Sequence, residues 1–151
     1  MRIVSVFITI ILLTSISGCK KSSPTGPVTI VDSFVGNWQI TSAGAVIAGG
    51  TMQIRSDGTI VVSLTGQQSY KEYFPVTLHI SEDGSLKSDI VRSSVKVGII
   101  SGTFSSFGNI NGTILSLTGE VGTFVGVLGS KDGDGTYQST QGNGTWSATK
   151  Q

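Results

Sequence analysis

The chain of 151 residues has only one cysteine and one histidine. A disulfide scaffold needs paired cysteines and a zinc site needs a cluster of cysteine and histidine ligands, so both classes are excluded. Charged residues are also scarce, at 13%, and ten basic against nine acidic residues leave no positive surplus for binding nucleic acid. Hydrophobic residues make up 38% of the chain, which is enough for a folded domain. The length predicts about one domain.

The longest apolar run lies at the N-terminus. Arg2 carries a positive charge, residues 3–13 are almost wholly apolar, and small residues follow up to Cys19. This order of charge, apolar stretch and small residues is typical of a secretory signal. A helix from Ile3 to Ile16 would reach about 21 Å at 1.5 Å per residue. That length is short of a hydrocarbon core of ~30 Å, so a permanent membrane span is disfavoured.

The segment Ile16-Ser17-Gly18-Cys19 resembles the lipobox of bacterial lipoproteins. The resemblance implies that residues 1–18 are a signal peptide and that Cys19 receives acyl chains such as palmitate. It also implies that the protein stays on a membrane of the cell envelope, and Lys20 after the cysteine suggests the outer membrane. An ordinary signal peptide with an incidental cysteine is the alternative. The only cysteine of the chain standing at this position favours the lipobox.

Residues 19–27 are expected to be the lipidated cysteine and a flexible tether. Residues 20–27 are polar and contain two of the three prolines. Eight residues reach at most about 26 Å when extended. The folded domain is therefore expected to span residues 28–151.

Apolar and polar residues alternate along most of this domain. Gly36, Trp38 and Ile40, for example, share one face, and polar residues occupy the other. One apolar and one polar face are typical of an antiparallel sheet with one solvated side. The same alternation predicts an inner set of residues: Met52, Ile54, Ile60, Val62, Leu64, Phe74, Val76, Leu78 and Ile80.

The runs predict an all-β domain of about eight to ten strands in a single up-and-down meander. Asp57-Gly58 and Asp83-Gly84 are typical of tight hairpin turns, because glycine tolerates a positive φ. A meander hides its sheet edges by closing into a barrel. The expected strands are 34–42, 50–56, 59–65, 70–81, 85–92, 96–106, 110–118, 121–129, 135–139 and 144–149.

A weak repeat of Gly-Thr followed by an apolar residue runs through the second half of the chain, at steps of 10, 10, 13 and 9 residues. This spacing matches one strand plus one turn. If the glycine shares the inner face with the residue two places on, it makes room for the large rings of Phe104, Phe124, Tyr137 and Trp146.

The first strand, Val35-Gly36-Asn37-Trp38, followed by a meander, is similar to the opening of lipocalin-like (calycin) barrels. The resemblance extends in layout from Phe34 to Gln151. It implies that Trp38 plugs a closed end and that a basic residue near the last strand packs across it. Lys150, past Trp146, is the basic residue near that strand. Another antiparallel barrel or a sandwich is the alternative architecture.

No arrangement typical of catalysis or of a cofactor or metal site stands out. His79 alternates onto the outer face, where it is expected to be solvated. Asp132-Gly133-Asp134-Gly135 begins like a calcium loop but lacks the glycine and glutamate that an EF-hand has at positions six and twelve. We interpret it as a hairpin turn. Asn111-Gly112 and Asn143-Gly144 are interpreted as turns or strand starts.

These observations predict a non-enzymatic envelope lipoprotein whose barrel binds a small apolar ligand or an envelope protein. The alternative is an interaction protein, such as an adhesin or a protease-inhibitor-like barrel, with a packed core. A cavity above ~300 Å³ open at one end favours the first, and a filled barrel with an exposed aromatic patch favours the second. The candidate ligand-binding or core residues are Trp38, Met52, Ile54, Phe74, Leu78, Phe104, Phe124, Tyr137 and Trp146.

Overall fold

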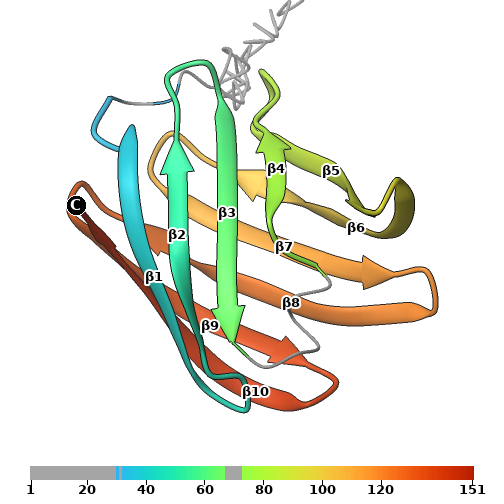
Figure 1. The fold of residues 1–151 in the computed structure, drawn as a ribbon. Coiled ribbons are helices and arrows are strands. Elements are labelled where there is room, and N and C mark those ends of the chain that lie inside the picture. The colour runs from blue at the N-terminus through green and yellow to red at the C-terminus, as the bar shows by residue number, and fades with distance from the viewer. Residues whose placement is uncertain (1–29, 31, 67–72) are drawn as a thin grey trace, which may run out of the picture.

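The structure, a computed structural model, describes residue 30, residues 32–66 and residues 73–151. Within them the chain forms ten strands and no helix (Figure 1). The signal segment, Cys19 and most of the tether lie outside the described residues. The strands are β1 (Gly36–Gly44), β2 (Ala48–Ile54), β3 (Thr59–Gly66), β4 (Val76–His79), β5 (Ser85–Arg92), β6 (Val95–Phe104), β7 (Asn109–Ser116), β8 (Gly119–Leu128), β9 (Asp132–Ser139) and β10 (Gly142–Lys150).

The ten strands form one antiparallel sheet in the order β4-β3-β2-β1-β10-β9-β8-β7-β6-β5. The first and last strands pair along their length, with Trp38 opposite Lys150. β4 and β5 share only the isolated bridge between Ile80 and Leu86 in the described residues. The sheet is therefore a nearly closed up-and-down barrel, which confirms the predicted all-β meander. Its seam lies between β4 and β5, in the middle of the chain.

The expected strand at 70–81 is wrong in its extent. Residues 67–72 lie outside the described residues, and β4 covers only Val76–His79. It begins directly after Pro75, which has no N–H to donate to a ladder. Phe74 consequently lies just before the strand, although its side chain still packs against the core.

The two Asp-Gly turns are confirmed. Gly58 and Gly84 have φ values of 86° and 81°, in the region that favours glycine. In each turn the aspartate side chain accepts a hydrogen bond from the backbone N–H two residues on, at 2.9 Å. This bond holds the pKa of both Asp57 and Asp83 below the ordinary value, because it stabilises the ionised carboxylate.

The interpretation of Asp132-Gly133-Asp134-Gly135 as a hairpin turn is wrong, because Asp132 begins β9 and these residues lie in that strand. For Asn111-Gly112 and Asn143-Gly144 the strand-start alternative holds, since they lie near the starts of β7 and β10. The physical reason is the space needed inside the barrel, because a Cβ at Gly112 or Gly144 would overlap the ring of Phe124 or Tyr137.

The expected room for large rings is present for three of the four rings, but the glycine that provides it lies on the neighbouring strand. Phe124 is directly opposite Gly112, Tyr137 is opposite Gly144, and Trp146 is opposite Gly135, whereas Phe104 is opposite Ile110. Each ring occupies the position that a side chain on the glycine would take. The repeat places an inward aromatic beside an inward glycine, as in the rescue of strand glycines by neighbouring rings.

One end of the barrel, here called the closed end, is made by the turns at 56–58, 81–84, 105–108 and 129–131. These turns are linked in series by backbone hydrogen bonds. Ile80 N donates to Gly58 O, Phe104 N to Gly84 O and Leu128 N to Gly108 O, at 2.8 to 3.0 Å. The opposite end, here called the open end, is made by the hairpins β1–β2, β5–β6, β7–β8 and β9–β10.

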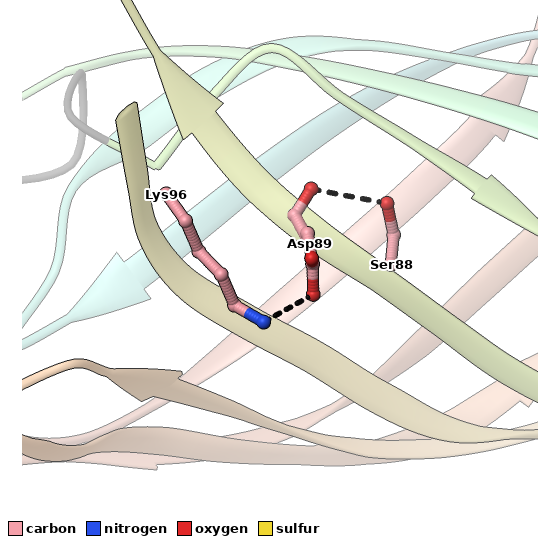
Figure 2. A network of polar contacts seen from close by, with 3 residues as sticks. All are labelled: Ser88, Asp89 and Lys96. Atoms are coloured by element: carbon pink, nitrogen blue, oxygen red, sulfur yellow. Dashed lines mark hydrogen bonds and ion pairs between the residues drawn. The ribbon is translucent and has the colours of Figure 1, made fainter. Parts of the chain in front are cut away.

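The free edge of β5 carries charges and an irregularity. Asp89 Oδ1 forms an ion pair with Lys96 Nζ on β6 at 2.7 Å, and Ser88 Oγ donates a hydrogen bond to the backbone oxygen of Asp89 (Figure 2). A bulge interrupts the pairing with β6 between Ile90 and Val91. Charges and bulges on an edge strand hinder pairing with other chains. In the described part of the chain, no helix is long and apolar enough to cross a membrane.

Candidate functional site

The interior of the barrel contains a cavity of about 220 Å³. It extends to the open end, where Ser42, Gln138 and Ser139 line it. Deeper in the barrel its walls are aliphatic and aromatic. Among the described residues that line it, none is charged. Lining residues include Ile40, Ala48, Met52, Ile60, Val62, Leu64, Tyr73, Phe74, Leu78, Leu86, Ile100, Ile110, Ile114, Phe124, Leu128, Tyr137 and Trp146.

Six of the nine predicted candidate residues line this cavity: Met52, Phe74, Leu78, Phe124, Tyr137 and Trp146. The other three, Trp38, Ile54 and Phe104, are almost fully buried and do not line it. They pack at the closed end of the barrel. The tertiary structure therefore divides the candidates into cavity wall and end plug, a division that alternation along single strands does not make.

Several cavity residues were missing from the candidate set. Ile100, Ile110 and Ile114 belong to β6 and β7 and line the wall. The alternation that identified Met52 also marks these aliphatic positions, but the Gly-Thr repeat marks only the aromatic ones. Tyr73 lies inside the expected strand 70–81, where alternation with the inward Phe74 puts it on the outer face. In the structure it precedes β4, so the alternation does not apply and its side chain lines the cavity.

The hydroxyl groups near the open end are already engaged in the protein. Tyr137 Oη accepts a hydrogen bond of 2.7 Å from Val46 N and lies within bonding distance of the carbonyl oxygens of Ala43 and Val46. Ser42 Oγ likewise accepts from Ala48 N at 3.0 Å. These bonds fix the β1–β2 hairpin beside the cavity opening, so the two hydroxyls act in positioning the rim.

Trp38 fills the closed end. Its side chain is fully shielded from solvent, and its Nε1 donates a hydrogen bond of 2.9 Å to Phe34 O. Lys150 Nζ lies 5.7 Å from the centre of the Trp38 ring and donates to Ser33 O at 2.8 Å. Phe34 and Phe104 meet edge to face beside it, with ring centres 5.4 Å apart. The basic residue across the tryptophan, which the lipocalin-like resemblance implied, is Lys150.

No catalytic arrangement is visible in the described ranges. His79 is exposed on the outer face, as the alternation predicted, with Thr59 Oγ1 at 3.3 Å from its Nδ1. Asp132 and Asp134 are exposed on β9. Groups of three or more potential metal ligands do not occur among the described residues. The cavity offers shape and apolar surface, which are the properties of a binding site.

The cavity lies between the two outcomes expected from the sequence. Its volume of about 220 Å³ is below the ~300 Å³ that marks an ordinary ligand pocket, yet the barrel is not filled. The large exposed aromatic is Phe107, 83% exposed in the turn at 105–108, and it stands on the closed end away from the cavity opening.

No family model matches the chain, and no curated protein matches it. Among solved structures, a de novo designed fluorescence-activating β-barrel is similar, with a TM-score of 0.41 and 14% sequence identity. The match covers 82% of this chain and 99% of the designed chain.

Proposed function

We propose that this protein is a lipoprotein of the bacterial cell envelope whose barrel binds a small apolar molecule and performs no catalysis. The cavity is the observation that supports this proposal. Its deep walls are apolar, and the described residues that line it include no charged group. Burial of apolar surface in such a site contributes about 25 cal/mol per Å², so a guest that fills it needs few polar contacts.

The lipid anchor is proposed from the resemblance at Cys19. Stable anchoring takes more than one acyl chain, which a lipoprotein cysteine provides. Ile30, the first described residue, and Phe34 are both buried in the core next to the closed end. The tether therefore joins the barrel at the end opposite the cavity opening.

Native mass spectrometry of the protein extracted from its own membranes tests the binding proposal. We expect a bound small molecule that remains with the full lipidated chain. Ile114→Phe adds a ring to the cavity wall and should abolish the bound mass. Leu115→Phe, on the outer face of the same strand and 37% exposed, is the matched control and should retain it. A wild-type protein without bound mass, or an Ile114→Phe protein that keeps it, contradicts the proposal.

A second candidate is an interaction lipoprotein that binds an envelope protein. The observation favouring it is a set of exposed aliphatic side chains at three hairpin tips of the open end: Ile47, Val95 and Leu117, each between 61% and 67% exposed. Exposed apolar groups of this kind mark contact surfaces when they gather. A co-purifying protein in the same spectra, with no small molecule, supports this candidate over the first.

A further inference from the structure

Arg92 lies on the inner face of β5. Leu86 and Ile90, which precede it at even spacing on the same strand, are 2% and 1% exposed. The neighbouring Val91 is 47% exposed on the other face. Because side chains alternate along a strand, Arg92 shares the inner face with the buried pair. It stands at the tip of the β5–β6 hairpin, opposite Val95, and so belongs to the open end.

The guanidinium group of Arg92 is only partly satisfied. Nη1 donates a hydrogen bond of 2.7 Å to the carbonyl oxygen of Val91. Nε and Nη2 are shielded from solvent and have no hydrogen-bond partner in the described part of the chain. The nearest acidic residue in sequence, Asp89, already forms an ion pair with Lys96 on the outer face (Figure 2). Buried charged donors without acceptors cost free energy, and such a group calls for an explanation.

The two unpaired nitrogens form one edge of the guanidinium fork. The N–H groups of Nε and Nη2 point the same way in the plane of the guanidinium group. This geometry lets them donate to both oxygens of a carboxylate or to two oxygens of a phosphate. An inward charge also protects a free strand edge. That role is already served on β5 by Lys87, the Asp89–Lys96 ion pair and the bulge at Ile90.

We propose that Arg92 receives the single anionic group, a carboxylate or phosphate, of a ligand whose apolar part occupies the cavity. This inference rests on the proposed binding function and names its ligand class. Leu86, six residues earlier on the same face, lines the cavity, whereas Arg92 does not. Six residues of strand span roughly 20 Å. The ligand is therefore an elongated amphiphile, with its tail in the cavity and its anionic end at the open end beside β5.

A matched pair of probes tests the inference: a long-chain fatty acid and its methyl ester, titrated at pH 7 into the full chain carrying Cys19→Ser. The charge-assisted bidentate bond should make the acid bind at least about tenfold more tightly than the ester. Arg92→Gln should remove this preference and leave ester binding unchanged. Arg92→Lys keeps the charge without the fork and should give an intermediate preference. Lys87→Gln, an exposed charge change on the same strand, is the control and should retain the full preference.

The outcomes separate this inference from the proposal beneath it. Equal binding of acid and ester by the wild-type protein overturns the role of Arg92 and leaves the binding function standing. Binding of neither probe, together with an empty native spectrum, contradicts the binding function itself. Inorganic phosphate is titrated as a further probe. If it raises the melting temperature only when Arg92 is present and the acid has no advantage, the site holds a free anion and the amphiphile is excluded.

Discussion

Trp38 combines a complete loss of solvent contact with two specific contacts, the hydrogen bond to Phe34 O and the Lys150 ammonium over its ring. Gly36 makes the second contact sterically feasible. A Cβ at Gly36 would lie 2.8 Å from Lys150 Cε, and the residue has a φ of 142° that other residues rarely adopt. The closed end therefore depends on a glycine, a tryptophan and a lysine acting together.

At this scale we predict that Trp38→Ala destabilises the protein severely. Truncation of a buried tryptophan typically costs about 3–5 kcal/mol, a large share of the roughly 5–15 kcal/mol of a whole domain. His79→Ala on the outer face is the control and should change the free energy of unfolding by no more than about 0.5 kcal/mol. Denaturant unfolding followed by circular dichroism measures both. A near-neutral Trp38→Ala would contradict the plug role.

Neighbouring strands in the second half of the barrel interlock through glycines and rings. Gly112 of β7 faces Phe124 of β8, while β9 and β10 exchange two such pairs. On the inner wall, the ring of one strand therefore fills the space that the glycine of the neighbouring strand leaves empty. This arrangement explains why Gly112, Gly135 and Gly144 stand inside strands, where no turn requires a glycine. It also leaves the strands free of inward charge over the cavity.

Substitutions at two glycines test this interlocking of neighbouring strands. Gly112→Ala should destabilise the fold by about 1–3 kcal/mol, because the new methyl group displaces the Phe124 ring and strains the pairing. Gly49→Ala is the control. Its Cβ would lie 3.8 Å from Ile40 O, an ordinary contact, and it should be neutral or stabilising by about 0.4–1 kcal/mol. Urea unfolding that ranks the two variants in the opposite order would contradict the interlocking.

At the scale of the whole molecule, the two ends of the barrel are unlike. The closed end contains the plug and receives the chain from the N-terminal segment, and the cavity reaches the open end. The sheet closes by pairing β1 with β10, and its seam between β4 and β5 leaves one edge of β5 unpaired beyond Leu86 in the described residues. An amphiphile bound at Arg92 would lie beside this seam.

The substitution Cys19→Ser tests the anchoring proposal. It should move the protein from the membrane fraction to the soluble fraction, because acylation at that position would be lost. The circular dichroism spectrum of the variant should remain that of the wild type, since Cys19 precedes every strand. A variant that stays fully membrane-bound contradicts the lipobox interpretation.

Much of the fold was predictable because its signals are local. Alternation identified Met52, Ile60 and Leu78 as inward, and the Asp-Gly pairs marked two hairpins correctly. The prediction was wrong at 132–135, where Asp-Gly pairs have the composition of a turn but begin β9. There Gly135 leaves room for the ring of Trp146 on another strand, a cause that the local sequence does not show.

The sequence by itself determined the class of the fold, the approximate strands and many of the inner residues, because these follow from periods of two and from turn chemistry within a few residues. Only the tertiary structure decided which inner residues plug the closed end and which line the cavity. It also decided that Lys150 lies over Trp38 and that the seam falls between β4 and β5. It decided further that two nitrogens of the inward Arg92 guanidinium have no partner in the described part of the chain. Each of these depends on the pairing register of strands or on closure of the sheet, and neither is encoded within a single strand.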